Sequence, residues 1–153
     1  MLTVISCKKD NVTNIHQGLT RIDYDINNPL EMPCIEFAFE NTHNLTNHTL
    51  MSVSLKANEL TANLHLKILL EDSGGHQTDV SPFIIQDTDL IKDNQLHSYT
   101  YDFRENLGSS TSISSEINIS GISKVIIYIN SGLSGSVAEG TFWLDNIQME
   151  ESD

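Results

Sequence analysis

The sequence predicts an all-β chain that folds as a two-sheet antiparallel β-sandwich of the jelly-roll type. Apolar and polar residues alternate with a period of two in the segments 35–40, 51–57, 64–70, 98–103, 125–130 and 142–149. Because successive side chains of a strand point to opposite faces, each segment has one face to bury. Helical periodicity is weak and the connections are short and polar, which favours antiparallel strands packed as two sheets.

Turn-forming residues mark where the expected strands end. Asp72-Ser73-Gly74-Gly75 separates the 64–71 segment from a partner expected at 76–86, which is a hairpin signature. Residues 106–115 are rich in Ser, Thr and Gly and predict a surface loop. Residues 117–122 predict one short helical turn before the next strand.

Length and composition fit a single folded domain. The chain has 153 residues, of which 39% are apolar and 19% are charged. Residues 1–20 are predicted to form an N-terminal arm or a lipoprotein linker, and residues 21–151 the β-sandwich domain. No run is long and apolar enough to span a bilayer.

The charge balance is strongly acidic. With 21 acidic and 8 basic residues, the formal net charge is −13. Such a chain repels phosphate backbones, so nucleic acid is excluded as the expected partner. An acidic surface suits neutral ligands and cations such as calcium, although it also serves solubility alone.

The N-terminus contains a short apolar segment that ends in a cysteine. Val4-Ile5-Ser6-Cys7 is similar to a lipobox, and the following Lys8-Lys9-Asp10 resembles the start of mature lipoproteins from Bacteroidetes-type bacteria. The resemblance implies a lipid anchor at Cys7 and an extracytoplasmic place, at the cell surface, in the periplasm or secreted. The segment before Cys7 lacks a charged region and a full-length apolar stretch. An unlipidated arm, with a Cys7–Cys34 disulfide in an oxidising compartment, therefore stays an alternative.

The second half of the chain contains three segments in a recognisable order. They are Tyr99-Thr100-Tyr101-Asp102-Phe103, the segment 119–132, and the final strand Gly140-Thr141-Phe142-Trp143-Leu144-Asp145-Asn146-Ile147. This order resembles that of the galactose-binding-like jelly-roll carbohydrate-binding modules of bacterial glycanases. The resemblance covers roughly residues 22–150. It implies a non-catalytic module that binds a plant or microbial polysaccharide, of the β-glucan or xylan type, alone or attached to a glycanase domain.

The same resemblance implies a structural calcium ion. Asp145 matches the final-strand aspartate that holds this ion in such modules, and Asp23 or Asp25 is the candidate N-terminal partner. Calcium takes six to eight oxygen ligands, so backbone carbonyls would complete the site. The alternative is that Asp145 caps a turn or accepts backbone hydrogen bonds.

Trp143 is the first candidate for contact with a sugar. It is the only tryptophan and alternates with Phe142 and Leu144, so it points outward if those two are buried. An aromatic ring on an outer sheet face is a platform for the C–H face of a pyranose. The alternative is a ring covered by a loop or by the N-terminal arm.

Polar residues of the middle strands complete the predicted ligand set. Tyr128 and Asn130 are expected on the outer face of their strand, where they can stack on a sugar and bond its hydroxyls. His65 and Lys67 join them as ligand residues, and Ser52, Ser54 and Lys56 are also expected to point outward. The alternative is a plain solvated face. Tyr99, Tyr101 and Phe103 are assigned to the core.

Two further classes of function stay open. A structural or adhesion sandwich would bind protein or act as a spacer, and a buried Trp143 would favour it. A small β-sandwich hydrolase would need paired carboxylates in a deep cleft. No nucleophile motif, phosphate loop or zinc-like histidine spacing is present in the sequence, so an enzyme is not expected.

Overall fold

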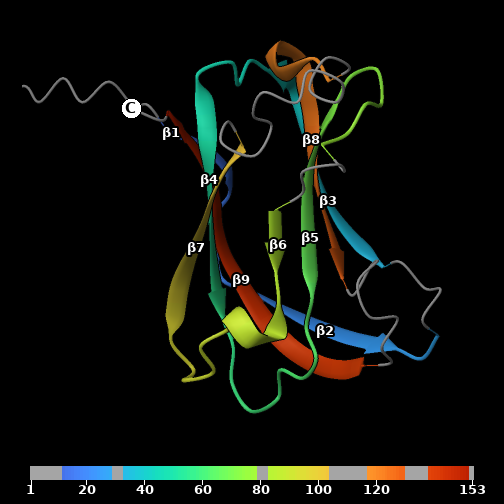
Figure 1. Cartoon of the computed structure of the whole chain (residues 1–153), viewed down its shortest axis with the longest axis vertical. Helices are drawn as coiled ribbons and strands as arrows, with labels where there is room; N and C mark the ends of the chain where they lie inside the picture. Colours follow the sequence, from blue (N-terminus) through green and yellow to red (C-terminus); the bar gives the residue numbers. More distant parts are fainter. Residues whose placement is uncertain (1–11, 29–32, 79–82, 104–116, 130–137, 152–153) are drawn as a thin grey trace, which may run out of the picture.

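Two antiparallel sheets face each other across one apolar core (Figure 1). The computed structural model describes residues 12–28, 33–78, 83–103, 117–129 and 138–151. Every strand pair in this part of the chain is antiparallel. The prediction of an all-β, two-sheet jelly-roll sandwich is confirmed.

Sheet A has five strands among the described residues and carries both ends of the described chain. Its order is β1-β9-β4-β7, and β2 also pairs with β9, beyond the end of β1. Figure 1 shows β9 as a long curved strand, and it pairs with β1, β2 and β4. The strands are β1 (Val12–His16), β2 (Thr20–Ile26), β4 (His48–Lys56), β7 (Leu96–Asp102) and β9 (Ala138–Glu151).

In the part of the chain that the structure describes, sheet B has four strands in the order β3-β8-β5-β6. They are β3 (Cys34–His43), β5 (Leu66–Asp72), β6 (Phe83–Ile85) and β8 (Ile122–Ile129). The single-turn 3-10 helices η1 (Asp87–Asp89) and η2 (Ile119–Gly121) lie in the connections. The predicted pairing of the 64–71 segment with 76–86 is confirmed, and η2 is the short turn predicted before β8.

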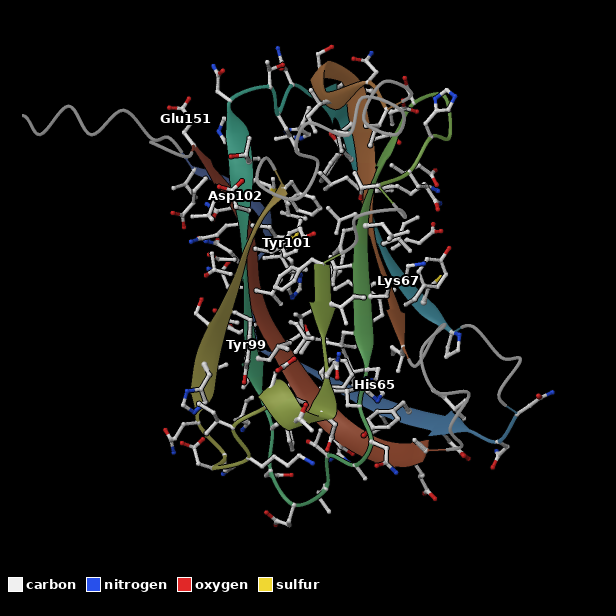
Figure 2. All side chains as sticks on the ribbon, in the orientation of Figure 1. His65, Lys67, Tyr99, Tyr101, Asp102 and Glu151 are labelled. Atoms are coloured by element: carbon white, nitrogen blue, oxygen red, sulfur yellow. The ribbon has the colours of Figure 1, made fainter. Side chains whose placement is uncertain are left out.

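The core follows the period-two pattern of the sequence. Alternate residues of β4, β5, β8 and β9 are buried between the sheets, and Phe103 is buried beside the partly buried Tyr99 and Tyr101. Figure 2 shows Tyr101 between the two sheets, where its ring stacks on Phe83 with centroids 5.1 Å apart. Burial of these rings and branched side chains supplies the main driving force for folding.

The sandwich begins earlier than the sequence indicated. Residues 12–16, placed in the N-terminal arm above, form β1 and pair with the end of β9. An edge strand buries little, and here Val12 and Asn14 are exposed while Ile15 is half-buried. The apolar alternation that identifies inner strands is therefore nearly absent from it.

A β-bulge interrupts the alternation of β9. Ser54 pairs with Asn146 and Leu55 pairs with Leu144, which leaves Asp145 without a counterpart on β4. Leu144 and Ile147 both lie in the core, although three positions separate them. A bulge inserts one extra residue and re-aims the side chains that follow. The bulge therefore leaves Asp145 and Asn146, rather than a single residue, between two core positions.

Asp72 ties the turn after β5 to the segment that precedes η2. Its side chain is 2% exposed. It accepts hydrogen bonds from the backbone N–H groups of Gly74, His76 and Asn118, at 2.8, 2.9 and 2.8 Å. Burial opposes the charged form, but these bonds and the His76 ring lower the pKa of Asp72 to about 2.

No helix in the described residues has the length and apolar character needed to cross a membrane.

Candidate functional site

Trp143 lies on the outer face of sheet A. Its neighbours on β9, Phe142 and Leu144, are buried in the core, while Trp143 is half-buried on the opposite face. The register places Lys56 of β4 on one side of it and Arg21 of β2 on the other. The Lys56 ammonium lies 4.4 Å from the centre of the indole ring, which is a cation–π contact.

Uncharged polar side chains continue this face along β9. Asn146 aligns with Ser54 and Ser98, and Gln148 aligns with Ser52 and Thr100. Residues two apart on a strand repeat on the same face about every 6.8 Å, and neighbouring strands lie about 4.8 Å apart. Hydroxyl and amide groups therefore form a regular grid beside the indole ring.

Hydrogen bonds between side chains hold this grid in place. The Asn146 amide donates to Gln148 at 3.2 Å, and the Gln148 amide donates to Glu150 at 2.6 Å. The hydroxyls of Ser52 and Thr100 lie 3.4 Å apart. The Trp143 face, as used below, is defined by the outward residues Arg21, Ser52, Ser54, Lys56, Ser98, Thr100, Trp143, Asn146 and Gln148.

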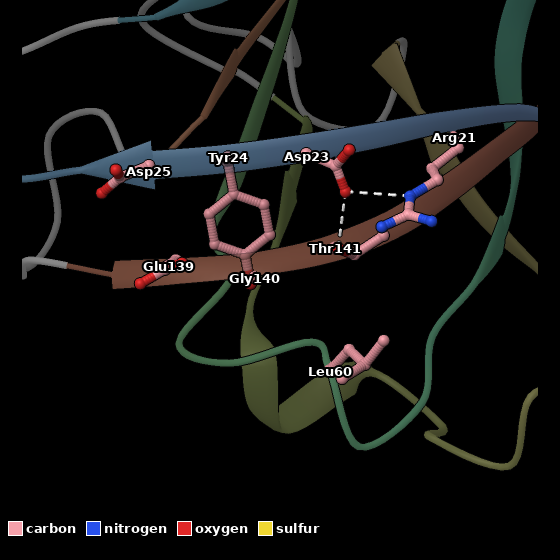
Figure 3. Close-up of a pocket in the computed structure, with 8 residues that line it drawn as sticks. All are labelled: Arg21, Asp23, Tyr24, Asp25, Leu60, Glu139, Gly140 and Thr141. Atoms are coloured by element: carbon pink, nitrogen blue, oxygen red, sulfur yellow. Dashed lines mark hydrogen bonds and ion pairs between the residues drawn. The ribbon is translucent and has the colours of Figure 1, made fainter.

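A hollow of about 510 Å³ adjoins the Trp143 face at the β2 end (Figure 3). This size is within the range of small-molecule sites. The exposed side chain of Leu60 lies on one side, and Arg21 links the hollow to Trp143. Its lining residues are Arg21, Asp23, Tyr24, Asp25, Leu60, Glu139, Gly140 and Thr141.

The loop after β4, which contains Leu60, forms a wall of the hollow because it is hydrogen-bonded to β9. The Thr141 N–H donates to the Leu60 carbonyl at 3.0 Å, and the Thr61 hydroxyl donates to the Thr141 carbonyl at 2.6 Å. The Tyr24 hydroxyl donates to the Ala62 carbonyl and accepts from the Ala62 N–H. These bonds replace the strand pairing that β4 no longer provides at this end of β9.

Asp23 is the best-connected carboxylate of the hollow. It accepts hydrogen bonds from the Thr141 hydroxyl at 2.7 Å and from Arg21 Nε at 3.0 Å, both drawn in Figure 3. These bonds, that from Thr141 first, hold the pKa of Asp23 below its usual value of 3.8. The hollow is acidic overall, because Asp23, Asp25 and Glu139 face one arginine.

The three carboxylates predicted to bind calcium do not converge. Asp23 pairs with Thr141, four residues before Asp145, and four residues of a strand span about 13 Å. In the described residues, no three His, Cys, Asp or Glu side chains lie close enough together to hold a metal ion. The set therefore does not fit one calcium ion, and calcium binding stays a prediction.

The predicted ligand residues divide between the two outer faces of the sandwich. Tyr128 and Lys67 are cross-strand neighbours on the outer face of sheet B, and His65 lies just before Leu66, the first residue of β5. Figure 2 shows Lys67 on β5 and His65 just before the start of this strand, which belongs to the sheet opposite the one that carries Trp143. Asn130 lies outside the described residues. A single site made of all these residues is thus not what the structure shows.

The outer face of sheet B is apolar and closed near its middle. Ile126 and Leu69 point away from the core but are only 2% and 1% exposed. Beside them, Lys124 forms ion pairs with Glu71 at 3.2 Å and Glu36 at 3.6 Å.

Sequence reasoning missed the residues of the hollow other than Asp23 and Asp25. Arg21, Leu60 and Thr141 come from β2, a loop and β9, and only the register brings them together. The one sequence signal was the Gly140-Thr141 pair that begins the final strand motif. A glycine inside a strand often marks a place where another backbone comes close.

Comparisons with known proteins identify the fold. No family model and no curated protein matches the sequence. PfGH50B aligns with a TM-score of 0.59 and 10% identity, over 93% of this chain and 24% of its own. The agarase AgWH50C gives 0.55 and 13%, over 90% and 25%. The family 30 carbohydrate-binding module of a cellulosomal cellulase from Clostridium thermocellum gives 0.55 and 9%, over 93% and 98%.

These likenesses differ in how much of the other protein they cover. The chain spans about a quarter of the length of PfGH50B and of the agarase, but nearly all of the Clostridium module. At identities of 9–13%, the alignments show a shared two-sheet sandwich. A fold of this kind carries many functions, so function has to be argued from the site.

Proposed function

We propose that the chain is a non-catalytic carbohydrate-binding module that holds a polysaccharide on the Trp143 face. The observation that carries the proposal is the place of the only tryptophan, on an open outer face beside a grid of hydroxyl and amide side chains. An indole packs on the C–H face of a pyranose, and Ser, Thr, Asn and Gln bond its hydroxyls. A sugar polymer presents both features at every unit.

The shape of the face favours an extended, soluble chain. The polar grid, Trp143 and the hollow follow one another along β9, so several sugar units can be contacted in succession. Only 7% of residues are aromatic, which does not suit the flat row of rings that a crystalline surface requires. We propose a β-glucan or a xylan as the ligand, in keeping with the similar module from a cellulase.

The setting of the module is also a proposal. The chain matches a module of equal length and parts of much longer chains, including an agarase. It would act either attached to a glycanase domain or as a separate extracytoplasmic lipoprotein held by Cys7. One lipid chain alone anchors weakly, so stable anchoring at Cys7 requires further acylation. Cys7 lies outside the described residues.

Affinity electrophoresis tests the proposal. The chain is run through gels that contain β-glucan, xylan, mannan or no polysaccharide, with and without EDTA. We expect retardation by β-glucan or xylan, and a loss of retardation in EDTA would make calcium part of the fold or the site. Migration unchanged by every polysaccharide would contradict the proposal and favour a structural or adhesion sandwich.

A further inference from the structure

Lys56 stands out among the basic residues of an acidic chain. In the described residues, Arg21, Lys92 and Lys124 each form an ion pair with a carboxylate. Lys56 and Lys67 have no such partner in that part of the chain, although the sequence contains 21 acidic residues. Lys56 belongs to the Trp143 face, whereas Lys67 lies on the opposite side of the sandwich.

The position of Lys56 affects what can stack on Trp143. Its ammonium lies over the indole ring, 4.4 Å from the ring centre. A neutral pyranose that stacks on this side of the ring has to displace the ammonium and gains no charged contact in return. A sugar with an acidic group allows Lys56 to turn toward that group, in a charge-assisted hydrogen bond. The geometry therefore favours an acidic ligand group at this point.

The charge of the site changes sign along β9. Arg21, Trp143 and Lys56 form one cross-strand row, the Trp143 row, whereas the hollow contains Asp23, Asp25 and Glu139. Asp23 lies one repeat beyond the Trp143 row and Asp25 two repeats beyond it, at about 7 and 14 Å along the strand. A polymer with a negative charge on every unit would be repelled in the hollow, but a polymer with scattered charges would not.

We propose that the Trp143 face selects polysaccharides with a neutral backbone and scattered acidic groups, and that Lys56 is the residue that recognises those groups. The acidic group can be a uronic acid carboxylate or a sulfate ester, since an ammonium binds either. The proposal rests on the proposed function, because it names the class of polysaccharide bound at the same site.

Matched polysaccharides test the proposal. Glucuronoxylan is compared with the same xylan after chemical reduction of its carboxyl groups, and lightly sulfated cellulose with hydroxyethyl cellulose. We expect the wild-type chain to bind the acidic member of at least one pair about 10-fold more tightly, as one charge-assisted hydrogen bond would give. The pair that shows the preference identifies the acidic group. The preference should shrink as salt is raised.

Two lysine variants locate the preference. Lys56→Met is expected to bring the acidic-to-neutral affinity ratio to about one, and Lys56→Arg to retain part of it. Lys67→Met lowers the net charge by the same amount on the opposite face, so it controls for long-range repulsion and should keep the ratio. Circular dichroism shows whether each variant is folded.

Two results would overturn the inference. Equal binding of neutral and acidic polysaccharides by the wild-type chain would do so and leave the proposed function in place. A preference lost in Lys67→Met and kept in Lys56→Met would overturn the inference and would also contradict binding on the Trp143 face, because Lys67 lies on sheet B. Failure to bind any of these polysaccharides would contradict both the inference and the proposed function.

Discussion

Asp72→Ala is expected to lower the free energy of unfolding by about 3 kcal/mol. The substitution removes the acceptor for the N–H groups of Gly74, His76 and Asn118, on a side chain that is only 2% exposed. Buried N–H groups that lose their acceptor destabilise the fold by more than the net free energy that their hydrogen bonds contributed. Urea denaturation measures the change. Asp72→Asn keeps one acceptor oxygen and should lose about half as much.

The same carboxylate makes stability depend on acid pH. Hydrogen bonds lower the pKa of Asp72 from an ordinary 3.8 to about 2 in the folded chain. A lowered pKa stabilises the fold above the unfolded value, and this contribution is lost as the pH falls through the folded value. The stability difference between wild type and Asp72→Ala should therefore shrink from pH 4 to pH 2. A difference that stays constant over this range would contradict the role of the charge.

Gly140→Ala is expected to lower the free energy of unfolding by about 2–3 kcal/mol. A Cβ atom at this position would lie 2.5 Å from the Leu60 carbonyl oxygen and even closer to the Tyr24 hydroxyl. The Leu60 carbonyl accepts a hydrogen bond from the Thr141 N–H, so it cannot move away without breaking that hydrogen bond. Overpacking against fixed backbone destabilises more than a clash with a free side chain.

Thermal denaturation of Gly140→Ala measures this effect, with Glu139→Ala as the matched control. Glu139 is exposed on the neighbouring position of the same strand, and its truncation should change stability by less than about 0.5 kcal/mol. Wild-type stability in Gly140→Ala would mean that the loop does not approach β9 as described. The hollow would then lack the wall formed by Leu60.

The sandwich could be predicted because its inner strands bury one face each. The alternation of apolar and polar residues in 51–57, 64–70 and 142–149 predicted both the strands and their core residues. The Asp72-Ser73-Gly74-Gly75 turn predicted the hairpin. The strand β1 could not be predicted in this way. It lies at an edge, buries little, and is held mainly by backbone hydrogen bonds to β9, which leave no mark on the pattern of residue types.

The candidate site could be predicted only in part, because strand alternation assigns a residue to one of two faces but does not say which sheet that face belongs to. Trp143 and Tyr128 were both expected to point outward, and both do. The strand order then places them on different sheets. The separation of Asp145 from Asp23 likewise depends on the register of β2 against β9, which the sequence does not reveal.

The central claim, that a polysaccharide binds on the outer face of sheet A, is tested most directly by two aromatic variants. Trp143→Ala and Tyr128→Ala each remove one aromatic side chain, from opposite outer faces. Their affinity for β-glucan and xylan is measured by affinity electrophoresis beside the wild type. We predict a loss of about 10-fold or more for Trp143→Ala and wild-type affinity for Tyr128→Ala. Wild-type affinity in Trp143→Ala, with binding lost in Tyr128→Ala, would contradict the claim.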